Sequence, residues 1–251
     1  MTGPDGFPQG YDFRHFSEID STNEEARRLA GDGVDGPLWI MAERQTAGRG
    51  RQGRQWVSQF GNLMTTCLLR PDCDLDKMGQ IGFVAGLALQ SCVAEMAGIE
   101  AKLKWPNDVL LEGAKCSGIL LETLGENSNG QQRLAVGIGL NLKSFPPDTP
   151  YPAISVLAAT GCEIEPLAAL ARLAHYFDRF YQMWDAEGFA ALREDWLSHA
   201  HGLDAPVNVQ LADRTVSGIL RSIDADGQLL VENEQGKTHI ITAGDVYFPE
   251  G

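Results

Sequence analysis

The sequence predicts an α+β domain, built on a mixed or antiparallel sheet with packed helices, followed by a small all-β domain. Between Phe13 and about residue 202, short β-type runs alternate with segments of helical periodicity. From Leu203 onward the helical pattern stops, and short β-type runs separated by turn residues replace it. We therefore place the domain boundary between the segments 1–202 and 203–251.

The first half of the larger domain is expected to begin with a strand at 13–19 and a helix starting at Ser21. Ser21 and Glu24 form a capping-box pattern, and apolar residues then recur at helical spacing. Two further strands, at 38–42 and 62–69, flank a segment rich in glycine and arginine. A long core helix should follow at 81–96, because its apolar residues recur at intervals of three and four.

The second half of this domain should continue with a strand at 101–105. Pro106 cannot continue a central strand, so a bend that projects polar groups is expected after it. A hairpin at 109–124, a strand at 134–138 and two helices at 167–184 and 189–196 complete the domain. The strand at 134–138 runs into alternating glycines, Gly137 and Gly139. They leave one face without side chains, so another group can lie against the backbone.

The smaller domain contains four β-type runs, at 207–211, 215–222, 228–232 and 238–242. Turn residues such as Asp226-Gly227 separate them. Several short strands at this spacing are typical of a small barrel, and a five-stranded barrel is expected.

Composition narrows the class of protein. The chain has 251 residues and a formal net charge of −14, which disfavours nucleic acids and anionic membrane surfaces as partners. Its five cysteines are scattered without a CxxC pair, which favours reduced, packed thiols over a zinc site. The first ten residues contain no apolar run of the signal-peptide type. We expect a cytoplasmic protein that binds neither nucleic acid nor membrane.

Against this acidic background, the segment 45–56 carries three arginines and three glycines and ends in Trp56. Glycines let the backbone approach a ligand closely, and arginine forks match carboxylate and phosphate oxygens. The tryptophan can stack on a base. The segment favours an anionic small molecule. Taken alone, it leaves open a nucleic-acid-binding segment of the RGG type or a solvated loop.

Several motifs in a consistent order resemble the biotin–protein ligases, and the resemblance covers nearly the whole chain from Phe13. Only 20 residues precede Ser21, so the resemblance is to the short form without an N-terminal helix-turn-helix repressor domain, and no operator binding is expected. The matching pieces are Ser21-Thr22-Asn23, Gly48-Arg49-Gly50-Arg51-Gln52-Gly53-Arg54 with Trp56, Lys104-Trp105-Pro106-Asn107-Asp108, Lys115 with Gly118-Ile119-Leu120, and Gly137, Gly139 and Asn141.

The resemblance implies a biotin/lipoate ligase-like catalytic domain, an SH3-like C-terminal barrel and a two-step reaction. Biotin and ATP, assisted by Mg²⁺, would give biotinyl-5′-adenylate, and the biotinyl group would pass to a lysine of a biotin carboxyl carrier domain. The carrier would belong to acetyl-CoA carboxylase or a related carboxylase, and a homodimer is left open. The chemistry agrees with the residues, because a carboxylate attacking a phosphate needs cations to offset their repulsion.

The resemblance also assigns roles to individual residues. The catalytic set is Lys115, Arg49 and Arg51. The biotin-binding set is Ser21, Thr22, Asn23, Gln45, Gly48, Gly50, Gly118 and Leu120. The set that binds ATP and the adenylate is Arg49, Gly50, Arg51, Arg54, Trp56, Asn107, Asp108 and Asn141. Asp108 is in addition the candidate Mg²⁺ ligand.

Two other functions remain as alternatives. A lipoate–protein ligase would share the catalytic fold and the adenylate chemistry. A non-catalytic module that binds a small ligand or a protein would leave the glycine- and arginine-rich segment and Lys115 without a role. That segment, with Trp56 and the C-terminal β domain, favours biotin over lipoate.

Overall fold

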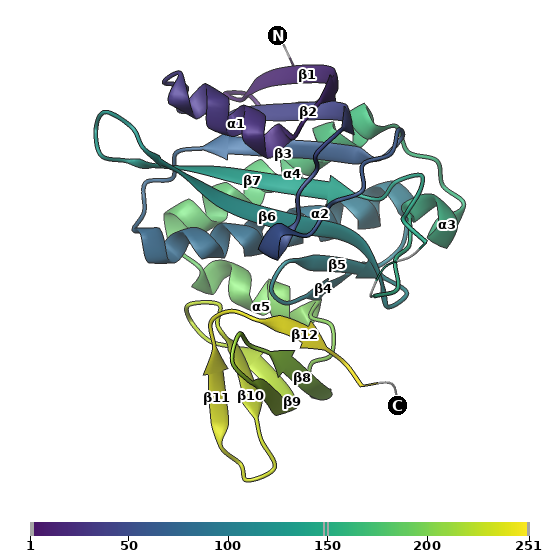
Figure 1. The fold of residues 1–251 in the computed structure, drawn as a ribbon, viewed down its shortest axis with the longest axis vertical. Coiled ribbons are helices and arrows are strands. Elements are labelled where there is room, and N and C mark those ends of the chain that lie inside the picture. Colours follow the sequence, from purple (N-terminus) through teal and green to yellow (C-terminus); the bar gives the residue numbers. More distant parts are fainter. Residues whose placement is uncertain (1–2, 148, 150, 250–251) are drawn as a thin grey trace.

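The larger domain is built on a seven-stranded mixed sheet (Figure 1). The structure is a computed structural model that describes residues 3–147, 149 and 151–249. The strand order is β1-β2-β3-β7-β6-β5-β4, in which β1 and β2 are parallel and the other pairs are antiparallel. The strands are β1 (Asp12–Ile19), β2 (Leu38–Gln45), β3 (Leu63–Leu69), β4 (Lys102–Lys104), β5 (Asp108–Leu111), β6 (Ala114–Glu126) and β7 (Gln132–Leu140).

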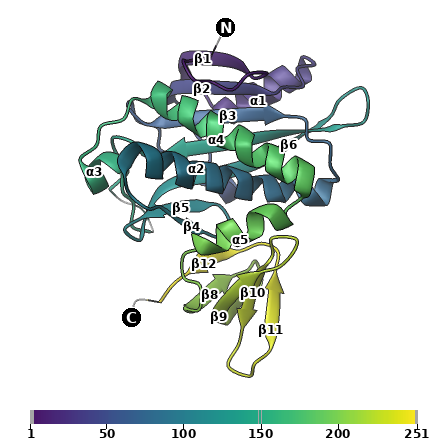
Figure 2. The ribbon, with the colours of Figure 1, turned by 180° about the vertical axis from the view of Figure 1, so that it is seen from behind.

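Helices cover the two faces of this sheet unequally. Helix α1 (Thr22–Gly31) lies on one face, whereas α2 (Ile81–Ala97) and α4 (Pro166–Glu187) lie on the other, as the two opposite views show (Figures 1 and 2). In the sequence, the short helix α3 (Val156–Thr160) lies between β7 and α4, and helix α5 (Ala190–Ser198) follows α4. Two 3-10 helices, η1 (Arg51–Gly53) and η2 (Leu75–Gln80), precede α2. The α1 face is therefore covered by fewer helices than the opposite face.

Helix α2 is the central core helix of the domain. The span Leu75–Ala97 is long and apolar enough to cross a bilayer, but 72% of its apolar window is buried inside the protein. It packs between the sheet, α4 and α5, and it ends at Gly98 in the left-handed conformation, with φ of 65°. Burial of this apolar surface is the main stabilising contribution to the domain.

The smaller domain is a five-stranded antiparallel sheet of order β11-β10-β9-β8-β12. The expected number of strands is confirmed, but the sequence did not locate the fifth, a three-residue strand near the C-terminus. The strands are β8 (Pro206–Gln210), β9 (Thr215–Ile223), β10 (Leu229–Glu232), β11 (Thr238–Ile241) and β12 (Asp245–Tyr247).

The two domains are joined by direct packing. The Trp105 indole N–H donates to the carbonyl of Gly227 at 3.0 Å, and Arg193 on α5 donates to the carbonyl of Ile223 at 2.8 Å. Phe83 of α2 lies against Gly227. Trp105 is thus a buried interdomain contact that also borders the pocket described below.

Most elements expected from the sequence are confirmed, and one local prediction is wrong. Helix α1 does begin after Ser21, but within the described residues the Ser21 side chain makes no capping hydrogen bond. The Glu24 carboxylate turns instead toward Arg49, 2.5 Å away, and Arg27, 3.6 Å away. The capping box fails because these cations draw the carboxylate away from the helix start.

Candidate active site

A pocket of about 210 Å³ crosses the α1 side of the large sheet. Its walls come from β2, β3, β7, β6, the turn between β4 and β5, the segment 49–57 and strand β12 of the smaller domain. Every predicted site residue lines it except Gly48. Gly48 is not a lining residue, but its carbonyl accepts the backbone N–H of the lining residue Trp56 at 3.0 Å and holds that residue in place.

A strip of glycines forms the floor of the pocket. A Cβ on Gly139 would lie 2.3 Å from the Trp56 indole, and a Cβ on Gly137 would lie 2.3 Å from the Asn23 side-chain oxygen. The prediction that other groups lie against this bare backbone is confirmed. The groups are an aromatic ring and an amide from two distant parts of the chain, so the two glycines position opposite ends of the pocket.

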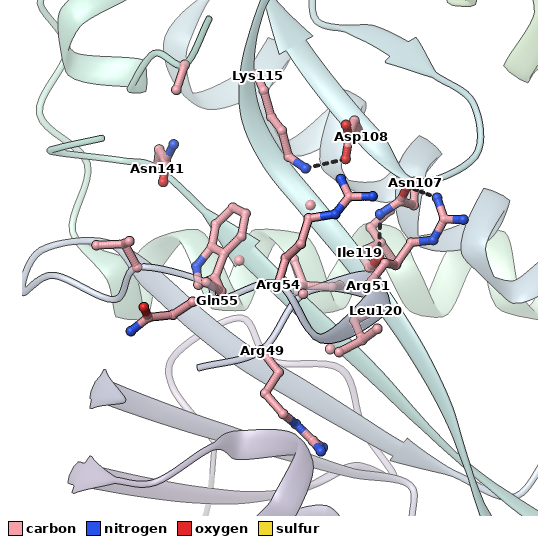
Figure 3. Close-up of a pocket in the computed structure, with 18 of the residues that line it drawn as sticks. Arg49, Arg51, Arg54, Gln55, Asn107, Asp108, Lys115, Ile119, Leu120 and Asn141 are labelled. Carbon is pink, nitrogen blue, oxygen red and sulfur yellow. Dashed lines mark hydrogen bonds and ion pairs between the residues drawn. The ribbon is translucent and has the colours of Figure 1, made fainter. Parts of the chain in front are cut away.

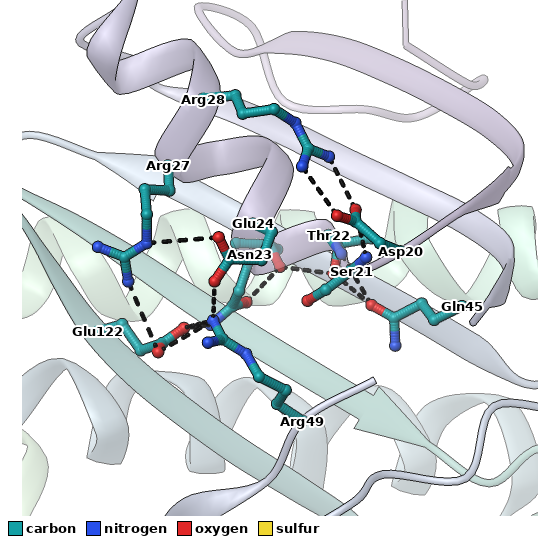
Figure 4. A network of polar contacts seen from close by, with 11 residues as sticks. Asp20, Ser21, Thr22, Asn23, Glu24, Arg27, Arg28, Gln45, Arg49 and Glu122 are labelled. Atoms are coloured by element: carbon teal, nitrogen blue, oxygen red, sulfur yellow. Dashed lines mark hydrogen bonds and ion pairs between the residues drawn. The ribbon is translucent and has the colours of Figure 1, made fainter. Parts of the chain in front are cut away.

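One end of the pocket is bordered by a network of uncharged side chains, which we call the amide–hydroxyl network: Thr22, Asn23, Gln45, Ser58 and Thr66. Figure 4 shows Thr22, Asn23 and Gln45 of this network, together with Glu122, whose carboxylate accepts the Asn23 amide N–H at 2.7 Å. The Gln45 oxygen accepts the backbone N–H of Thr22 at 2.8 Å, and its nitrogen donates to the Ser58 hydroxyl at 3.0 Å. The Thr66 hydroxyl donates to the Asn23 oxygen at 2.6 Å. Buried hydroxyls and amides in fixed orientations suit a neutral polar ligand.

Arg49 lies at the edge of this network, away from the other predicted catalytic residues. Its guanidinium group pairs with Glu24 at 2.5 Å and with Glu122 at 2.9 Å (Figure 4). In the close-up of the pocket it points in a different direction from Lys115 and Arg51 (Figure 3). The structure therefore does not bring Arg49 together with Lys115, because two carboxylates hold its side chain elsewhere.

Lys115 belongs to the charged side chains of the pocket. Its ammonium group is 2.5 Å from Asp108 and 5.8 Å from the centre of the Trp56 ring. Its backbone is fixed on both sides, because its N–H donates to Pro152 at 2.8 Å and its carbonyl accepts from Ile154 at 3.0 Å. A cation held in this way above the bare backbone of Gly118 can meet a phosphate or carboxylate in a fixed place.

The other end of the pocket is strongly charged, and the smaller domain contributes to it. Arg51 donates to the Asn107 oxygen at 2.9 Å, and Asn107 donates to the carbonyl of Ile119 at 2.9 Å (Figure 3). Arg54 pairs with Asp245 of β12. The segment that carries these arginines is therefore held by the loop after β4 on one side and by the C-terminal domain on the other.

Lys104, Tyr151 and Asp245 also line this end, and the sequence reasoning missed all three. The Lys104 ammonium lies 4.8 Å from the centre of the Tyr151 ring. Burial, together with the positive charge of Lys115, lowers the pKa of Lys104, while Asp108 and Asp245 oppose that shift. Lys104 stands in the quoted Lys-Trp-Pro-Asn-Asp motif and could have been found there, whereas no sequence signal marked Asp245. The other lining residues that lie outside the quoted motifs are Gln55, Val57, Thr65, Ile138, Pro146, Thr149, Ala153 and Val246.

The carboxylates of the pocket fit a magnesium ion that is held mainly by substrate phosphates. Among the described residues, no group of three or more histidine, cysteine, aspartate or glutamate side chains could hold a metal. Mg²⁺ in nucleotide sites needs only one or two carboxylates besides phosphate oxygens. Asp108, beside Lys115, meets that need, and its role as a ligand stays a prediction.

Cys116 is not a nucleophile in this site. Its thiol is buried, donates to the carbonyl of Val109 at 3.4 Å, and has its pKa raised to about 12 by burial. A thiolate is therefore not available near neutral pH. The expectation of a packed thiol is confirmed.

Sequence comparisons match both domains. The profile of the biotin/lipoate A/B protein ligase family matches residues 16–141, and that of the biotin protein ligase C terminal domain matches residues 202–248. The biotin–[acetyl-CoA-carboxylase] ligase of Paracoccus denitrificans is 41% identical over 92% of this chain and 98% of its own length. The bifunctional ligase/repressor BirA of Bacillus subtilis is 33% identical over 90% of this chain and 70% of its own length.

A solved structure shares the whole fold. The biotin protein ligase from Aquifex aeolicus, in complex with biotin and ATP, superposes with a TM-score of 0.84 at 27% identity, over 95% of this chain and 99% of that one. The predicted fold class is thereby confirmed for both the mixed sheet with its helices and the C-terminal β domain.

Proposed function

The chain belongs to the biotin/lipoate A/B protein ligase family, and on that premise we propose that it activates biotin with ATP and transfers the biotinyl group to a lysine of a biotin carboxyl carrier domain. It is an ATP-dependent ligase that uses biotin and ATP as substrates. The observation that carries the proposal is the pocket itself, which joins a neutral amide–hydroxyl network to a cluster of cations across a floor of glycines. A ligand with a ureido ring at one end and a carboxylate at the other matches that order.

In the first half-reaction, a biotin carboxylate oxygen bonds to the α-phosphorus of ATP, and the bond from that phosphorus to the bridging oxygen breaks. Pyrophosphate leaves with the electron pair. We assign Lys115 to the position between the carboxylate and the α-phosphate, because its fixed ammonium can offset their repulsion. The Mg²⁺ that accompanies ATP supplies further neutralisation of phosphate charge, and Asp108 is the residue that would hold it.

The amide–hydroxyl network is the proposed ureido site. Ser21, Thr22 and Asn23 are each at least 96% buried and lie at the start of α1, and Gln45 closes the site from β2. Gly118 and Leu120, on β6, would border the ligand between the network and Lys115. Because the network is already hydrogen-bonded, little reorganisation is needed when the ring binds.

The adenine is assigned to the Trp56 side of the pocket. Asn141 lines the same pocket, and its amide nitrogen donates to the carbonyl of Ile154 at 3.2 Å, which leaves its oxygen to accept from an adenine amine. Arg49 pairs with Glu24 and Glu122 in this structure, so a catalytic role requires it to leave those partners when the ligand binds. Arg51 and Arg54 are closer candidates for the phosphates.

In the second half-reaction, the acceptor lysine amine attacks the carbonyl carbon of the adenylate. An amide bond forms and its nitrogen loses a proton, while the mixed-anhydride C–O bond breaks and AMP leaves. Two relatives are named for acetyl-CoA carboxylase, which supports a carboxyl carrier domain of that enzyme or a related carboxylase as the acceptor. A homodimer and the lack of nucleic-acid binding stay predictions that sedimentation and DNA titration would test.

The lipoate alternative is distinguished by one assay. Purified protein is given ATP with biotin, with lipoate or with neither, and pyrophosphate release is measured. Biotin should drive release and a mass increase of one biotinyl group on an added carrier domain. Release driven by lipoate would keep the adenylate chemistry and overturn the substrate. If neither biotin nor lipoate drives pyrophosphate release, the protein is the non-catalytic module.

A further inference from the structure

Glu122 is a charged residue beside the amide–hydroxyl network that has no role in the reaction proposed above. It lies on the same face of β6 as Gly118 and Leu120, because side chains on a strand alternate between faces. Those two residues line the pocket, whereas Glu122 is not a lining residue and its side chain is 21% exposed. An effect of Glu122 on a bound ligand must therefore pass through the groups that its carboxylate contacts.

The Glu122 carboxylate fixes the orientation of the Asn23 amide. Guanidinium groups of Arg49 and Arg27 balance its charge at 2.9 Å and 3.7 Å (Figure 4). The carboxylate also accepts the side-chain N–H of Asn23, a residue that is only 4% exposed, at 2.7 Å. An ionised carboxylate accepts hydrogen bonds and cannot donate them. Asn23 must therefore turn its NH₂ group toward Glu122 and its oxygen away from it.

The orientation of Asn23 sets the direction of the next hydrogen bonds in the network. The Asn23 oxygen accepts from the buried Thr66 hydroxyl at 2.6 Å, and this bond uses the single hydrogen of that hydroxyl. The Thr22 hydroxyl oxygen lies 2.7 Å from the Thr66 oxygen and 3.0 Å from the Gln45 oxygen, so its hydrogen goes to one of these two. The Thr22 oxygen, in the wall of the pocket, is then left to accept from a ligand.

We propose that Glu122 is a positioning residue for biotin, which sets the direction of these hydrogen bonds so that the Thr22 oxygen accepts a ureido N–H. This assignment rests on the function proposed above. A glutamine at position 122 could donate to Asn23 as well as accept, so the Asn23 amide could turn over and donate to Thr66. The Thr66 hydroxyl would then donate to the Thr22 oxygen and compete there with the ureido N–H.

The isosteric substitution Glu122→Gln tests this role. Biotin binding is measured by calorimetry, and initial rates of pyrophosphate release are measured over a range of biotin concentrations at saturating ATP. The Kd and the KM for biotin should both rise about tenfold, because one buried hydrogen bond to the ligand is weakened. The kcat at saturating biotin and the KM for ATP should stay at the wild-type values, since the charged end of the pocket is unchanged.

Glu122→Asp separates hydrogen-bond direction from packing. Glutamine keeps the shape of the side chain and loses the acceptor-only carboxylate, whereas aspartate is shorter and keeps it. We expect Glu122→Asp to bind biotin more tightly than Glu122→Gln, the reverse of the order that a packing role would give. Glu126→Gln is the matched control, because Glu126 lies on the same strand and accepts only from the exposed Gln132 among the described side chains. It should leave the KM for biotin at the wild-type value.

Thr66→Val tests whether Glu122 acts through this chain of hydrogen bonds or through its pair with Arg49. The variant breaks the chain at Thr66 and should also raise the KM for biotin. In the double variant with Glu122→Gln, the KM should be no higher than in the more affected single variant, because both changes disturb one chain. If Glu122→Gln does not fold, as judged by circular dichroism, Glu122→Asp combined with Thr66→Val provides the same comparison.

Three results would overturn the assignment of Glu122. The first is a folded Glu122→Gln enzyme with an unchanged Kd for biotin. The second is an equal loss in the kcat or in the KM for ATP, which would give Glu122 a general role in the whole pocket. The third is additive effects of Glu122→Gln and Thr66→Val, which would leave Arg49 as the route. Failure of the proposed function would differ from all three, since wild-type enzyme would then release no pyrophosphate with biotin.

Discussion

The two ends of the pocket are held together by different physical interactions. At the amide–hydroxyl network, side chains from α1, β2 and β3 are held mainly by hydrogen bonds between uncharged groups of one domain, and Asn23 donates one further bond to the Glu122 carboxylate. At the charged end, Arg51, Arg54 and Lys115 are held by a carboxylate or an amide, and one of the carboxylates, Asp245, comes from the other domain. A site whose hydrogen bonds are already formed can bind a neutral ring without rearranging. Binding a polyanion requires cations that can exchange their carboxylate or amide partners for oxygens of the ligand.

The largest expected effect comes from Lys115→Met. Removing one fixed donor to a developing charge costs about 10²–10³ in rate, so biotin-dependent pyrophosphate release should fall by that factor. The variant should still bind biotin, because the amide–hydroxyl network is untouched. Lys143→Met, at an exposed pair with Glu163, is the control and should behave as wild type. A loss smaller than tenfold would mean that the charged end does not carry the chemistry.

Two glycines on one strand give a matched test of the contrast between the ends. Gly139→Ala would place a methyl group 2.3 Å from the Trp56 indole, and Gly137→Ala would place one 2.3 Å from the Asn23 amide. Overpacking of this kind costs about 1–3 kcal/mol, or roughly tenfold in affinity. We expect Gly139→Ala to raise the KM for ATP and Gly137→Ala to raise the KM for biotin. If each variant raised both constants equally, the two ends would not be independent.

Ionic strength should separate the two ends without any mutation. Salt screens ion pairs at partly exposed sites and leaves neutral hydrogen bonds nearly unaffected. Between about 0.05 and 0.5 M salt we expect the KM for ATP to rise severalfold and the KM for biotin to rise less. Initial rates at each salt concentration measure both constants. Equal dependence would show that charge also governs recognition at the amide–hydroxyl network.

The smallest expected effect concerns Asp20, just before α1. Two hydrogen bonds from Arg28 lower the pKa of Asp20 to about 2. The unfolded chain, with a pKa near 3.9, therefore binds more protons, so this contribution to stability is present above about pH 4 and is lost as the pH falls toward 2. Because the pair is about half exposed, it contributes only a few tenths of a kcal/mol. Urea unfolding between pH 5 and 2 should show this slope in wild type and a shallower one in Asp20→Asn.

The sequence could predict what depends on local pattern. Helix α2 and its glycine stop, the strands and the bare face at Gly137 and Gly139 all follow from periodicity and from the lack of a side chain. The resemblance of several motifs then marked a set of residues that, except for Gly48, all line the pocket. These properties are fixed within a few residues of chain, so no knowledge of tertiary contacts was needed.

The sequence could not predict what depends on partners far along the chain. Arg49 was expected beside Lys115, but Glu122, 73 residues away, holds its guanidinium group elsewhere. Asp245 lies in a three-residue strand with too little pattern to be recognised, and its partner Arg54 is 191 residues away. Lys104 was inside a recognised motif, yet only the folded structure shows that its ammonium group lies against Tyr151 and Phe248 at the wall of the pocket.

The contact between the domains also determines whether the smaller domain can be removed or exchanged. Buried residues of the smaller sheet, such as Val209 and Leu229, belong to the same apolar cluster as Phe83 and Trp105 of the larger domain. Two domains that share one hydrophobic core are expected to unfold together, in a single cooperative transition. A chain truncated before β8 would expose Phe83 and Trp105 to water and would tend to aggregate. The C-terminal sheet is therefore a structural part of the enzyme rather than an exchangeable module, and grafting it onto a related ligase would require its counterpart surface to move with it.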